Sequence, residues 1–347
     1  MSNTPEDSAL PNNVIQNYEL KEILGKGAFG QIYKATINMV DVAIKIEPPS
    51  TKKQVLKIET QILKRLQELK SPYFLKLLGY GNFEYKGRFY QYMVMQLAGN
   101  NLSDIRKKQQ GQKFTMSTCC LLLKEMLFAI RDFHKAGYVH RDIKPSNFAV
   151  DKSRQYPRSR IFLLDFGLAR KLMKSEGVIK SPRMDAGFRG TARYASIQAH
   201  ESKDLSKVDD LWSLFYVMVE FMRGQLPWRK EKDKERIGDM KRVLTSPQLL
   251  QGLPEQTIAI LKYLKSLDYY SEPNYDYIAG QLDAMFAATN DTLDVSWDWE
   301  KEVQETASML TTEGLRGISD FPAENNDSPE VLLIYIEERC NHVSTRE

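Results

Sequence analysis

The chain has 347 residues, of which 42% are hydrophobic and 27% charged, and its formal net charge is +4. These values are ordinary for a globular protein of one large or two smaller domains, and so small a charge requires neither nucleic acid nor a membrane surface as a partner. No apolar run reaches the ~18 residues of a membrane span, and the polar start lacks the order of a signal peptide. The cysteines show neither metal-ligand nor disulfide spacing and so favour a reducing compartment; they are Cys119, Cys120 and Cys340.

The first part of the chain reads as a lead-in followed by strands. Residues 1–16 are polar and contain two prolines, and we expect them to be disordered. Strand-like segments follow at residues 18–24, 31–35 and 42–46. The first two flank Gly25-Lys26-Gly27-Ala28-Phe29-Gly30, whose glycines allow backbone amides to approach phosphate oxygens. Dinucleotide-binding folds also use this spacing, but between a strand and a helix, whereas here a strand follows.

Lys45 lies in the third of these strands, within Val42-Ala43-Ile44-Lys45. Taken alone it reads as a solvated lysine on an edge strand, but its distance from the glycine-rich stretch favours contact with phosphates. Apolar residues at helical spacing then predict a helix over about 52–69. Glu59 on this helix is the expected partner of Lys45. Glu68 is the alternative, but it falls too near the helix end to reach inward.

Two further strands are expected between residue 73 and Gln96, and the periodicity becomes helical beyond Leu102. Residues 118–135 predict a largely buried helix, and residues 210–222, apolar nearly all round, predict a helix at the centre of a domain. We expect the carboxylate of Asp210, at the start of that central helix, to tether the loop described next. Alternating charges over 229–242 predict a solvated helical face. Other helices are expected at 256–267, 275–288 and, in the polar tail, 331–339.

The stretch that carries the most chemistry is His140-Arg141-Asp142-Ile143-Lys144-Pro145-Ser146-Asn147, followed by Asp165-Phe166-Gly167. Asp142 can accept a hydroxyl proton, and Lys144 can neutralise a phosphate. Asn147 and Asp165 can hold a metal ion. Phosphoryl transfer needs such a set, because the catalyst mainly positions the transferring group and neutralises its charge. Two acidic turns of an unrelated α/β protein are the alternative, and the complete eight-residue loop disfavours it.

Residues 170–193 are strongly basic, with seven lysines and arginines against two acids. A basic segment beside a substrate groove favours acidic or already phosphorylated targets. A solvated loop that only keeps the protein soluble is an equal alternative. We expect the Thr191 hydroxyl to link Asp142 and Lys144.

These motifs, in this order, resemble the eukaryotic protein kinase family over about residues 18–300. Gly190-Thr191-Ala192-Arg193-Tyr194-Ala195-Ser196, in place of the usual Ala-Pro-Glu region, is similar to the casein kinase 1 superfamily. Residues 188–191, 209–216 and 224–230 resemble the tau-tubulin kinase branch. A lysine at position 144 is typical of serine/threonine rather than tyrosine kinases. The tail beyond about 301 shows no obvious microtubule-binding region.

The resemblance implies an α+β, bilobal protein kinase fold, with a small β-rich N-lobe carrying one regulatory helix and a larger, mainly α C-lobe. The expected parts are a lead-in at 1–16, the N-lobe at 17–97, the C-lobe at 98–301, and a tail at 302–347 with a possible docking helix. The implied cofactors are ATP and Mg²⁺, and the implied partners are protein substrates with Ser/Thr acceptors. We expect a monomer in the cytoplasm, with the nucleus as a second location, and neither a nucleic acid nor a membrane as a partner.

The resemblance also implies roles for individual residues. Asp142 would be the base, and the other catalytic residues would be Lys144, Lys45, Asn147 and Asp165, of which the last two hold the metal. Nucleotide contacts are expected from Leu24, Gly25, Lys26, Gly27, Gly30, Ile32, Ala43, Lys45, Glu59, Met95, Gln96 and Leu97. Met95 would be the gatekeeper, and Gln96 and Leu97 would bond the adenine. A pseudokinase scaffold with a docking tail is the alternative. Because Ala-Pro-Glu is missing, something other than its glutamate must anchor residues 170–193, the activation segment.

Overall fold

The computed structural model describes residues 14–27, 30–49, 54–152, 158–174, 177–244 and 246–301, and the chain divides into two units after Leu293. The tail helix expected at 331–339 lies outside the described residues, as do residues 1–13 of the lead-in expected over 1–16. Val14 and Ile15 form strand β1, so the expectation of disorder was wrong for the end of that lead-in. In the second unit the rings of Trp297 and Trp299 stack with their centroids 5.4 Å apart. Within the described ranges, no helix combines the length and the apolar character needed to cross a membrane.

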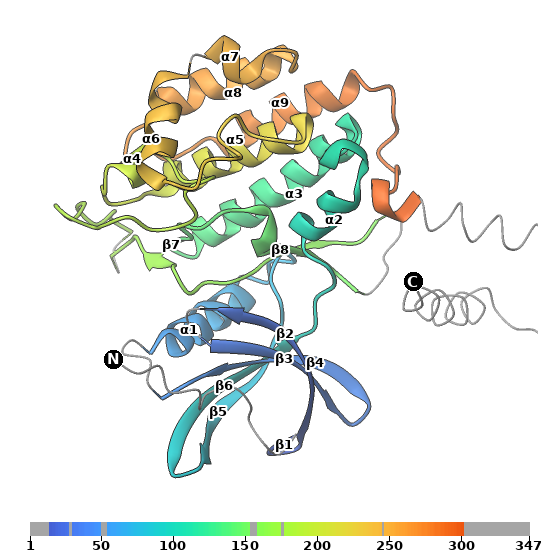
Figure 1. Cartoon of the computed structure of the whole chain (residues 1–347), viewed down its shortest axis with the longest axis vertical. Helices are drawn as coiled ribbons and strands as arrows, with labels where there is room; N and C mark the ends of the chain where they lie inside the picture. Colours follow the sequence, from blue (N-terminus) through green and yellow to red (C-terminus); the bar gives the residue numbers. More distant parts are fainter. Residues whose placement is uncertain are drawn as a thin grey trace, which may run out of the picture. The chain divides into compact units, whose positions relative to one another are not determined.

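The first unit begins with an antiparallel sheet in the strand order β1-β2-β3-β4-β6-β5 (Figure 1). Its strands are β1 (Val14–Ile15), β2 (Tyr18–Gly27), β3 (Gly30–Ile37), β4 (Val40–Glu47), β5 (Leu77–Tyr85) and β6 (Arg88–Gln96). Helix α1 (Val55–Glu68) packs against β4, β5 and β6. The glycine-rich stretch is therefore the tip of the β2–β3 hairpin rather than a separate loop, since β2 continues to Gly27 and β3 starts at Gly30.

Strand β4 is buried on both faces, because two different elements cover it. Val42, Ile44 and Ile46 join an apolar cluster with residues of β2, β3 and β6. Side chains alternate along a strand, so Lys45 and Glu47 point to the opposite face, where both contact α1. The alternation of the sequence thus puts a lysine and a glutamate inside the protein, on the face that carries the candidate site.

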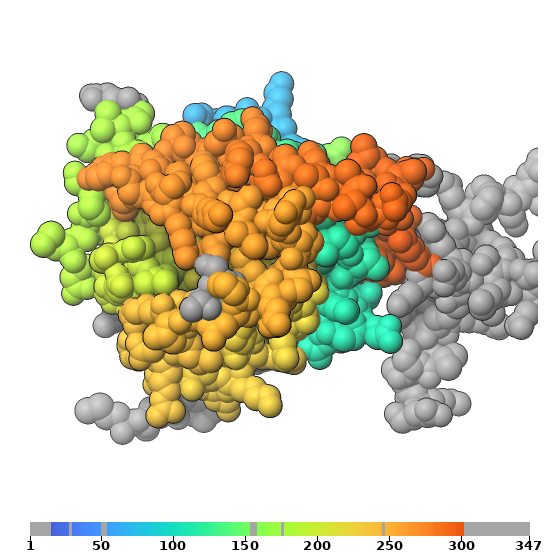
Figure 2. All heavy atoms as spheres, turned by 90° about the horizontal axis from the view of Figure 1, so that it is seen from above, coloured from blue at the N-terminus to red at the C-terminus, as the bar shows by residue number. Residues whose placement is uncertain are grey.

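The second part of the first unit is mainly helical and is built around α3 (Met116–Lys135) and α5 (Lys207–Arg223), which pack against each other. Nearly every residue of α5 is buried, as its all-round apolar sequence predicts. The remaining helices are α2 (Leu102–Lys108), α4 (Ile197–His200), α6 (Lys234–Val243), α7 (Ser246–Leu250), α8 (Glu255–Lys265) and α9 (Tyr275–Ala287). Helices α6 to α9 form most of the face seen in Figure 2.

Short strands position the two acidic motifs. β8 (Phe148–Val150) pairs with β9 (Ile161–Leu163). The residues that follow the 140–147 loop therefore lie beside the residues that precede Asp165. β7 (Tyr138–Val139) precedes that loop and pairs with β10 (Arg170–Lys171) at the start of the activation segment. Two hairpin-like pairings therefore hold the acidic loops together at the end of the helical part that faces the sheet (Figure 1).

The expectation of a purely solvated helical face over residues 229–242 was wrong in one respect. Helix α6 forms there, but Lys241 is only 6% exposed, because it reaches back under the activation segment. Alternating charge describes most of the helix, yet one lysine of the pattern has buried partners. The short helices α4 and α7 were not anticipated at all.

Gly224 ends α5 with φ of +84°, and a Cβ atom there would lie 2.3 Å from the carbonyl oxygen of Gly111. We predict that Gly224→Ala lowers the free energy of unfolding by about 2–5 kcal/mol, because left-handed strain adds to a backbone clash. Gly252→Ala is the matched control, since Gly252 has φ of +77° but open space around its Cβ position. It should cost only about 1–2 kcal/mol. Equal losses in urea unfolding would contradict the role of the clash.

Candidate active site

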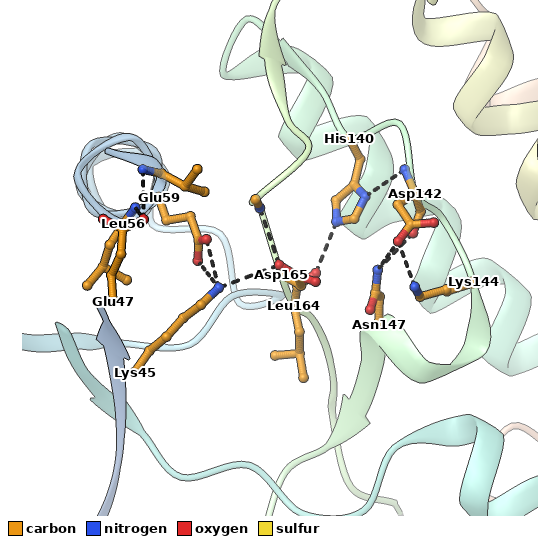
Figure 3. Close-up of polar contacts among 12 residues, drawn as sticks. Lys45, Glu47, Leu56, Glu59, His140, Asp142, Lys144, Asn147, Leu164 and Asp165 are labelled. Carbon is orange, nitrogen blue, oxygen red and sulfur yellow. Dashed lines mark hydrogen bonds and ion pairs between the residues drawn. The ribbon is translucent and has the colours of Figure 1, made fainter. Parts of the chain in front are cut away.

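The pair formed by Lys45 and Glu59 joins the sheet to α1. The Lys45 Nζ lies 2.7 and 2.8 Å from the two carboxylate oxygens of Glu59, and both side chains are buried. A third group, the Oδ1 of Asp165, lies 3.6 Å from the same nitrogen (Figure 3). Burial alone would lower the pKa of Lys45, but the charges of Glu59 and Asp165 outweigh it and hold that pKa above its ordinary value. Glu68, by contrast, is exposed and pairs with Arg65.

Glu47 is a residue of this site that sequence reasoning missed. Its Oε1 accepts the backbone N–H groups of Val55 and Leu56 at 3.0 and 3.3 Å. An acid at a helix N-terminus satisfies free amides and interacts favourably with the helix dipole. Glu47 therefore fixes the start of α1, one turn before Glu59. The signal was present in the sequence, since Glu47 is two residues after Lys45 on the same face of β4 and lies just before a predicted helix.

Asp210 of α5 holds the 140–147 loop by its backbone. Its carboxylate accepts the backbone N–H groups of His140 at 2.7 Å and Arg141 at 2.8 Å, and it bonds His134 Nε2 at 2.8 Å. Burial alone would raise the pKa of Asp210, but these hydrogen bonds keep it below its ordinary value. Burial lowers the pKa of His134, whose Nδ1 lies 2.7 Å from the Tyr275 hydroxyl. The tether predicted for Asp210 is confirmed by these contacts.

Asp142 is nearly buried and is surrounded by donors. Thr191 Oγ1 donates to its Oδ1 at 2.8 Å, and Lys144 Nζ donates to its Oδ2 at 2.7 Å. Lys144 also reaches Thr191 Oγ1, at 3.1 Å, so the expected link through this hydroxyl is present. The amide nitrogen of Asn147 donates to the backbone carbonyl of Asp142 at 2.8 Å. The orientation of Asp142 is thus set by three side chains.

Asp165 lies between the Lys45–Glu59 pair and the Asp142 group in Figure 3. Its φ of +60° is uncommon for a non-glycine residue, and its side chain is 48% exposed. Burial alone would raise the pKa of Asp165, but the Lys45 ammonium leads the interactions that bring it below its ordinary value. The following Phe166 is buried and stacks on Phe133 with ring centroids 5.2 Å apart. A buried aromatic anchor thus holds an exposed carboxylate in a strained conformation.

His140 connects the two acidic motifs. Its Nε2 lies 3.0 Å from the carbonyl oxygen of Leu164, and its Nδ1 accepts the N–H of Asp142 at 3.3 Å. One neutral ring can make both bonds, with the proton on Nε2. His140 therefore has the structural place that was expected of it, between Asp142 and the residue before Asp165.

Asn147 and Asp165 have the chemistry of a magnesium site. The amide nitrogen of Asn147 is engaged by Asp142, so its carbonyl oxygen is the atom left to bind a cation. With the Asp165 carboxylate this makes two oxygen ligands, the type that Mg²⁺ prefers when phosphates and water complete its shell. No cluster of three or more His, Cys, Asp or Glu residues able to hold a metal occurs in the described part of the chain. The residues fit a metal that arrives with a nucleotide.

The glycine-rich hairpin and the strand at its base leave room for a ligand. A Cβ atom at Gly25 or Gly27 would meet nothing within 4 Å, whereas one at Gly30 would lie 2.1 Å from the Ile46 carbonyl oxygen. Gly30 is therefore needed by the fold, and the two others leave open space. Ala28 and Phe29 lie outside the described residues.

The segment expected to bond adenine is placed at the end of β6. Met95 pairs with Ala43 across the sheet, and both are buried. The backbone N–H of Gln96 donates to the Lys76 carbonyl at 2.9 Å. The N–H of Gln96 is therefore engaged within the protein and is not available to a ligand. The other expected nucleotide-binding residues, Leu24, Lys26 and Ile32, lie on β2 and β3.

Lys241 of α6 is one anchor of the activation segment. Its Nζ donates to the carbonyl oxygens of Ala192 at 2.7 Å and Ala195 at 2.6 Å. It also lies 4.7 Å from the ring centroid of Tyr216 and 5.1 Å from that of Trp228. Burial brings the pKa of Lys241 well below its ordinary value. A buried lysine thus holds two carbonyls of the Gly-Thr-Ala-Arg-Tyr-Ala-Ser sequence.

Two acids of α5 provide further anchors. Glu220, fully buried, accepts the Tyr194 hydroxyl at 2.7 Å and lies 3.7 Å from Arg193. Asp209 accepts the Ser196 hydroxyl at 2.6 Å. These contacts supply the anchorage that the missing Ala-Pro-Glu glutamate left open.

We predict that Asp210→Ala lowers the free energy of unfolding by at least about 3 kcal/mol, because it leaves two buried backbone N–H groups and the His134 ring without an acceptor. Urea unfolding followed by tryptophan fluorescence measures the change. Asp239→Ala, which removes a 71% exposed carboxylate from α6, should stay within about 0.5 kcal/mol of the wild type. A loss at Asp210 no larger than this control would rule out the tether.

The chain matches known proteins over most of its length. A protein kinase domain model matches residues 18–310. A probable serine/threonine-protein kinase of Dictyostelium discoideum is 44% identical over 287 residues, which are 82% of this chain and 57% of that protein. A putative serine/threonine-protein kinase of Caenorhabditis elegans is 33% identical over 294 residues, 83% of each chain.

Casein kinase I homolog 3 of Schizosaccharomyces pombe is 30% identical over 310 residues, 86% of this chain and 68% of that protein. The chain thus spans little more than half the length of the Dictyostelium relative but most of the other two. The family match agrees with the β-rich sheet and the helical part described above, so the expected bilobal α+β kinase fold is confirmed. The chain belongs to the protein kinase domain family, among serine/threonine kinases.

Proposed function

We propose that this protein is an active kinase that transfers the γ-phosphate of Mg·ATP to Ser/Thr hydroxyls of proteins. The observation that carries the proposal is the meeting of Lys45 and Asp165 at 3.6 Å. His140 links the backbone N–H of Asp142 to the carbonyl of Leu164, the residue before Asp165. A cation for phosphates, a carboxylate for a metal and a carboxylate for a hydroxyl proton are the groups that phosphoryl transfer needs.

Each residue has a role that its contacts support. Lys45, oriented by Glu59, binds the α- and β-phosphates. Asp165 and Asn147 hold Mg²⁺, which when bound neutralises the charge on the phosphate oxygens. Because its pKa is below the ordinary value, Asp165 is ionised at neutral pH and needs no proton loss to bind the cation.

Asp142 accepts the proton of the substrate hydroxyl, and Lys144 neutralises the γ-phosphate. The Thr191 bond directs one carboxylate oxygen of Asp142, and Lys144 holds the other. Both bonds limit the rotation of the carboxylate, which is what a general base needs to meet an incoming hydroxyl.

The finer assignments follow from sequence. We propose an N-lobe at 17–97, a C-lobe at 98–301, and membership of the tau-tubulin kinase branch of the casein kinase 1 superfamily. The basic activation segment supports a preference for acidic or already phosphorylated sites. Arg189 is a better candidate for this preference than Arg183, because Arg183 is paired with Asp204.

We predict that Asp142→Asn lowers kcat for phosphate transfer to casein or an acidic peptide by on the order of a hundredfold or more, because the general base is lost. Radiolabel transfer from ATP measures it. Asp239→Asn, an exposed carboxylate remote from these residues, should leave kcat unchanged. A wild type no more active than Asp142→Asn would favour the pseudokinase scaffold instead.

We also predict that Arg189→Glu reduces the preference for acidic over neutral peptides by about tenfold, because it reverses a charge on the activation segment. The ratio of kcat/KM values on a peptide array is the measurement. Lys262→Glu makes the same charge change on the exposed side of α8. If both variants keep the wild-type ratio, Arg189 does not read the substrate.

A further inference from the structure

Asp204, in the loop between α4 and α5, is a buried carboxylate shared by two arginines of the activation segment. Its side chain is fully buried. Arg170, at the start of the segment, pairs with its Oδ2, and Arg183, near the middle, reaches it with Nη2 at 3.0 Å and Nε at 3.3 Å. The backbone N–H of Arg183 donates to the same Oδ2 at 3.0 Å. One carboxylate thus joins two points of the segment that are 13 positions apart in the sequence.

A third arginine, Arg141, belongs to the same electrostatic group. Burial, followed by the charges of Arg183 and Arg170, lowers the pKa of Arg141 to about 10, while Asp204 and Asp210 oppose this shift. Arg141 precedes Asp142, and its Nε donates to the Leu168 carbonyl at 2.8 Å, just beyond Asp165-Phe166-Gly167. Arg141 thus links the loop of Asp142 to Leu168, which lies two residues before Arg170.

Arg170 and Arg183, which share one carboxylate, would repel each other unless an anion compensated them. In many switching proteins that anion is a phosphate added to the mobile segment, which becomes ordered through new arginine pairs. Here the compensating carboxylate is part of the chain, and it lies outside the segment that it holds. Hydrogen bonds from Arg183 and Arg170 bring the pKa of Asp204 to about 2 even though burial opposes this, so it is ionised at every physiological pH.

We propose that Asp204 is a built-in counter-anion that takes the place of an activating phosphate, and that it keeps the activation segment in its working position without any modification. The inference rests on the proposed kinase function and adds a positioning residue to it. Asp204 touches neither nucleotide nor substrate in this assignment. It acts through Arg170 and Arg183.

The first test compares phosphate transfer by phosphatase-treated wild type, Asp204→Ala, Asp204→Glu and Asp185→Asn. Asp185 is an exposed acid of the same segment that bonds only its neighbour Gly187 among the described residues, so its variant is the matched control. We expect wild type and Asp185→Asn to be equally active, Asp204→Glu to keep most activity, and Asp204→Ala to lose about tenfold in kcat for the peptide with little change in KM for ATP. Wild-type activity in Asp204→Ala would overturn the inference.

Rescue by an anion separates this role from an ordinary structural ion pair. Inorganic sulfate, added at constant ionic strength against sodium chloride, should restore the activity of Asp204→Ala in a saturable way and should not activate the wild type or Asp204→Glu. A folded Asp204→Ala enzyme that stays inactive at all sulfate concentrations contradicts the proposal. If Asp204→Ala does not fold, the isosteric Asp204→Asn replaces it under the same criteria.

Thermal melting with sulfate gives a readout that does not depend on catalysis. Sulfate should raise the melting temperature of Asp204→Ala or Asp204→Asn more than that of the wild type, because only the variants have a vacant anion site. Equal shifts would count against the counter-anion. An inactive wild type together with unequal shifts would reject the proposed kinase function while leaving Asp204 as the occupant of an anion site.

Discussion

The carboxylate of Asp210 is the interaction on which the rest of the site depends. A charge at the start of a helix buried on all sides is costly unless donors surround it. The sequence supplies two backbone N–H groups from the 140–147 loop and one ring nitrogen from α3. Satisfying this one group therefore positions the loop, and with it Asp142, against the central helix. The strained φ of +68° at Arg141 persists because Asp210 holds the backbone N–H groups of His140 and Arg141.

The same principle recurs at other buried charges among the described residues of the first unit. Lys45 pairs with Glu59, and Asp204 pairs with Arg170 and Arg183. Glu220 lies 3.5 Å from the buried Arg106 and accepts the Tyr194 hydroxyl. Buried pairs of this kind add little net stability, since desolvation offsets most of the attraction. These pairs instead fix the positions of the segments that carry the two partners, because moving either partner leaves a buried charge without compensation. A catalyst that works mainly by placing and neutralising charge gains from contacts of that type.

The features that could be predicted from the sequence are those with a short-range signal. Periodicity indicated α1, α3, α5, α8 and α9, and each lies within a few residues of its expected place. Glu59 could be chosen over Glu68 because helix geometry alone limits which acid can face the sheet. Glu47 had such a signal too, in the alternation along β4.

Contacts between distant segments were expected for Asp210 and Thr191 and are present, but two others gave no signal in the sequence. Lys241 belongs to a charge-alternating helix, and only the packing of α6 beneath residues 192–195 makes it a buried donor. Arg183 was counted among the seven basic residues of segment 170–193, but its partner Asp204 lies 21 positions further along the chain and outside the segment. In both cases the sequence showed correctly that the segment is charged. It did not show the partner in another segment that buries or neutralises the charge.

These pairings redefine the charge that the activation segment presents. Arg170 and Arg183 are compensated by Asp204, and Arg193 lies near Glu220. No described acid lies within ion-pair distance of the segment's other cations, which are Lys171, Lys174, Lys180 and Arg189. The seven basic residues counted in the sequence thus form two groups. Three are paired with acids outside the segment, and the other four are the ones that the proposed preference for acidic substrates can draw on.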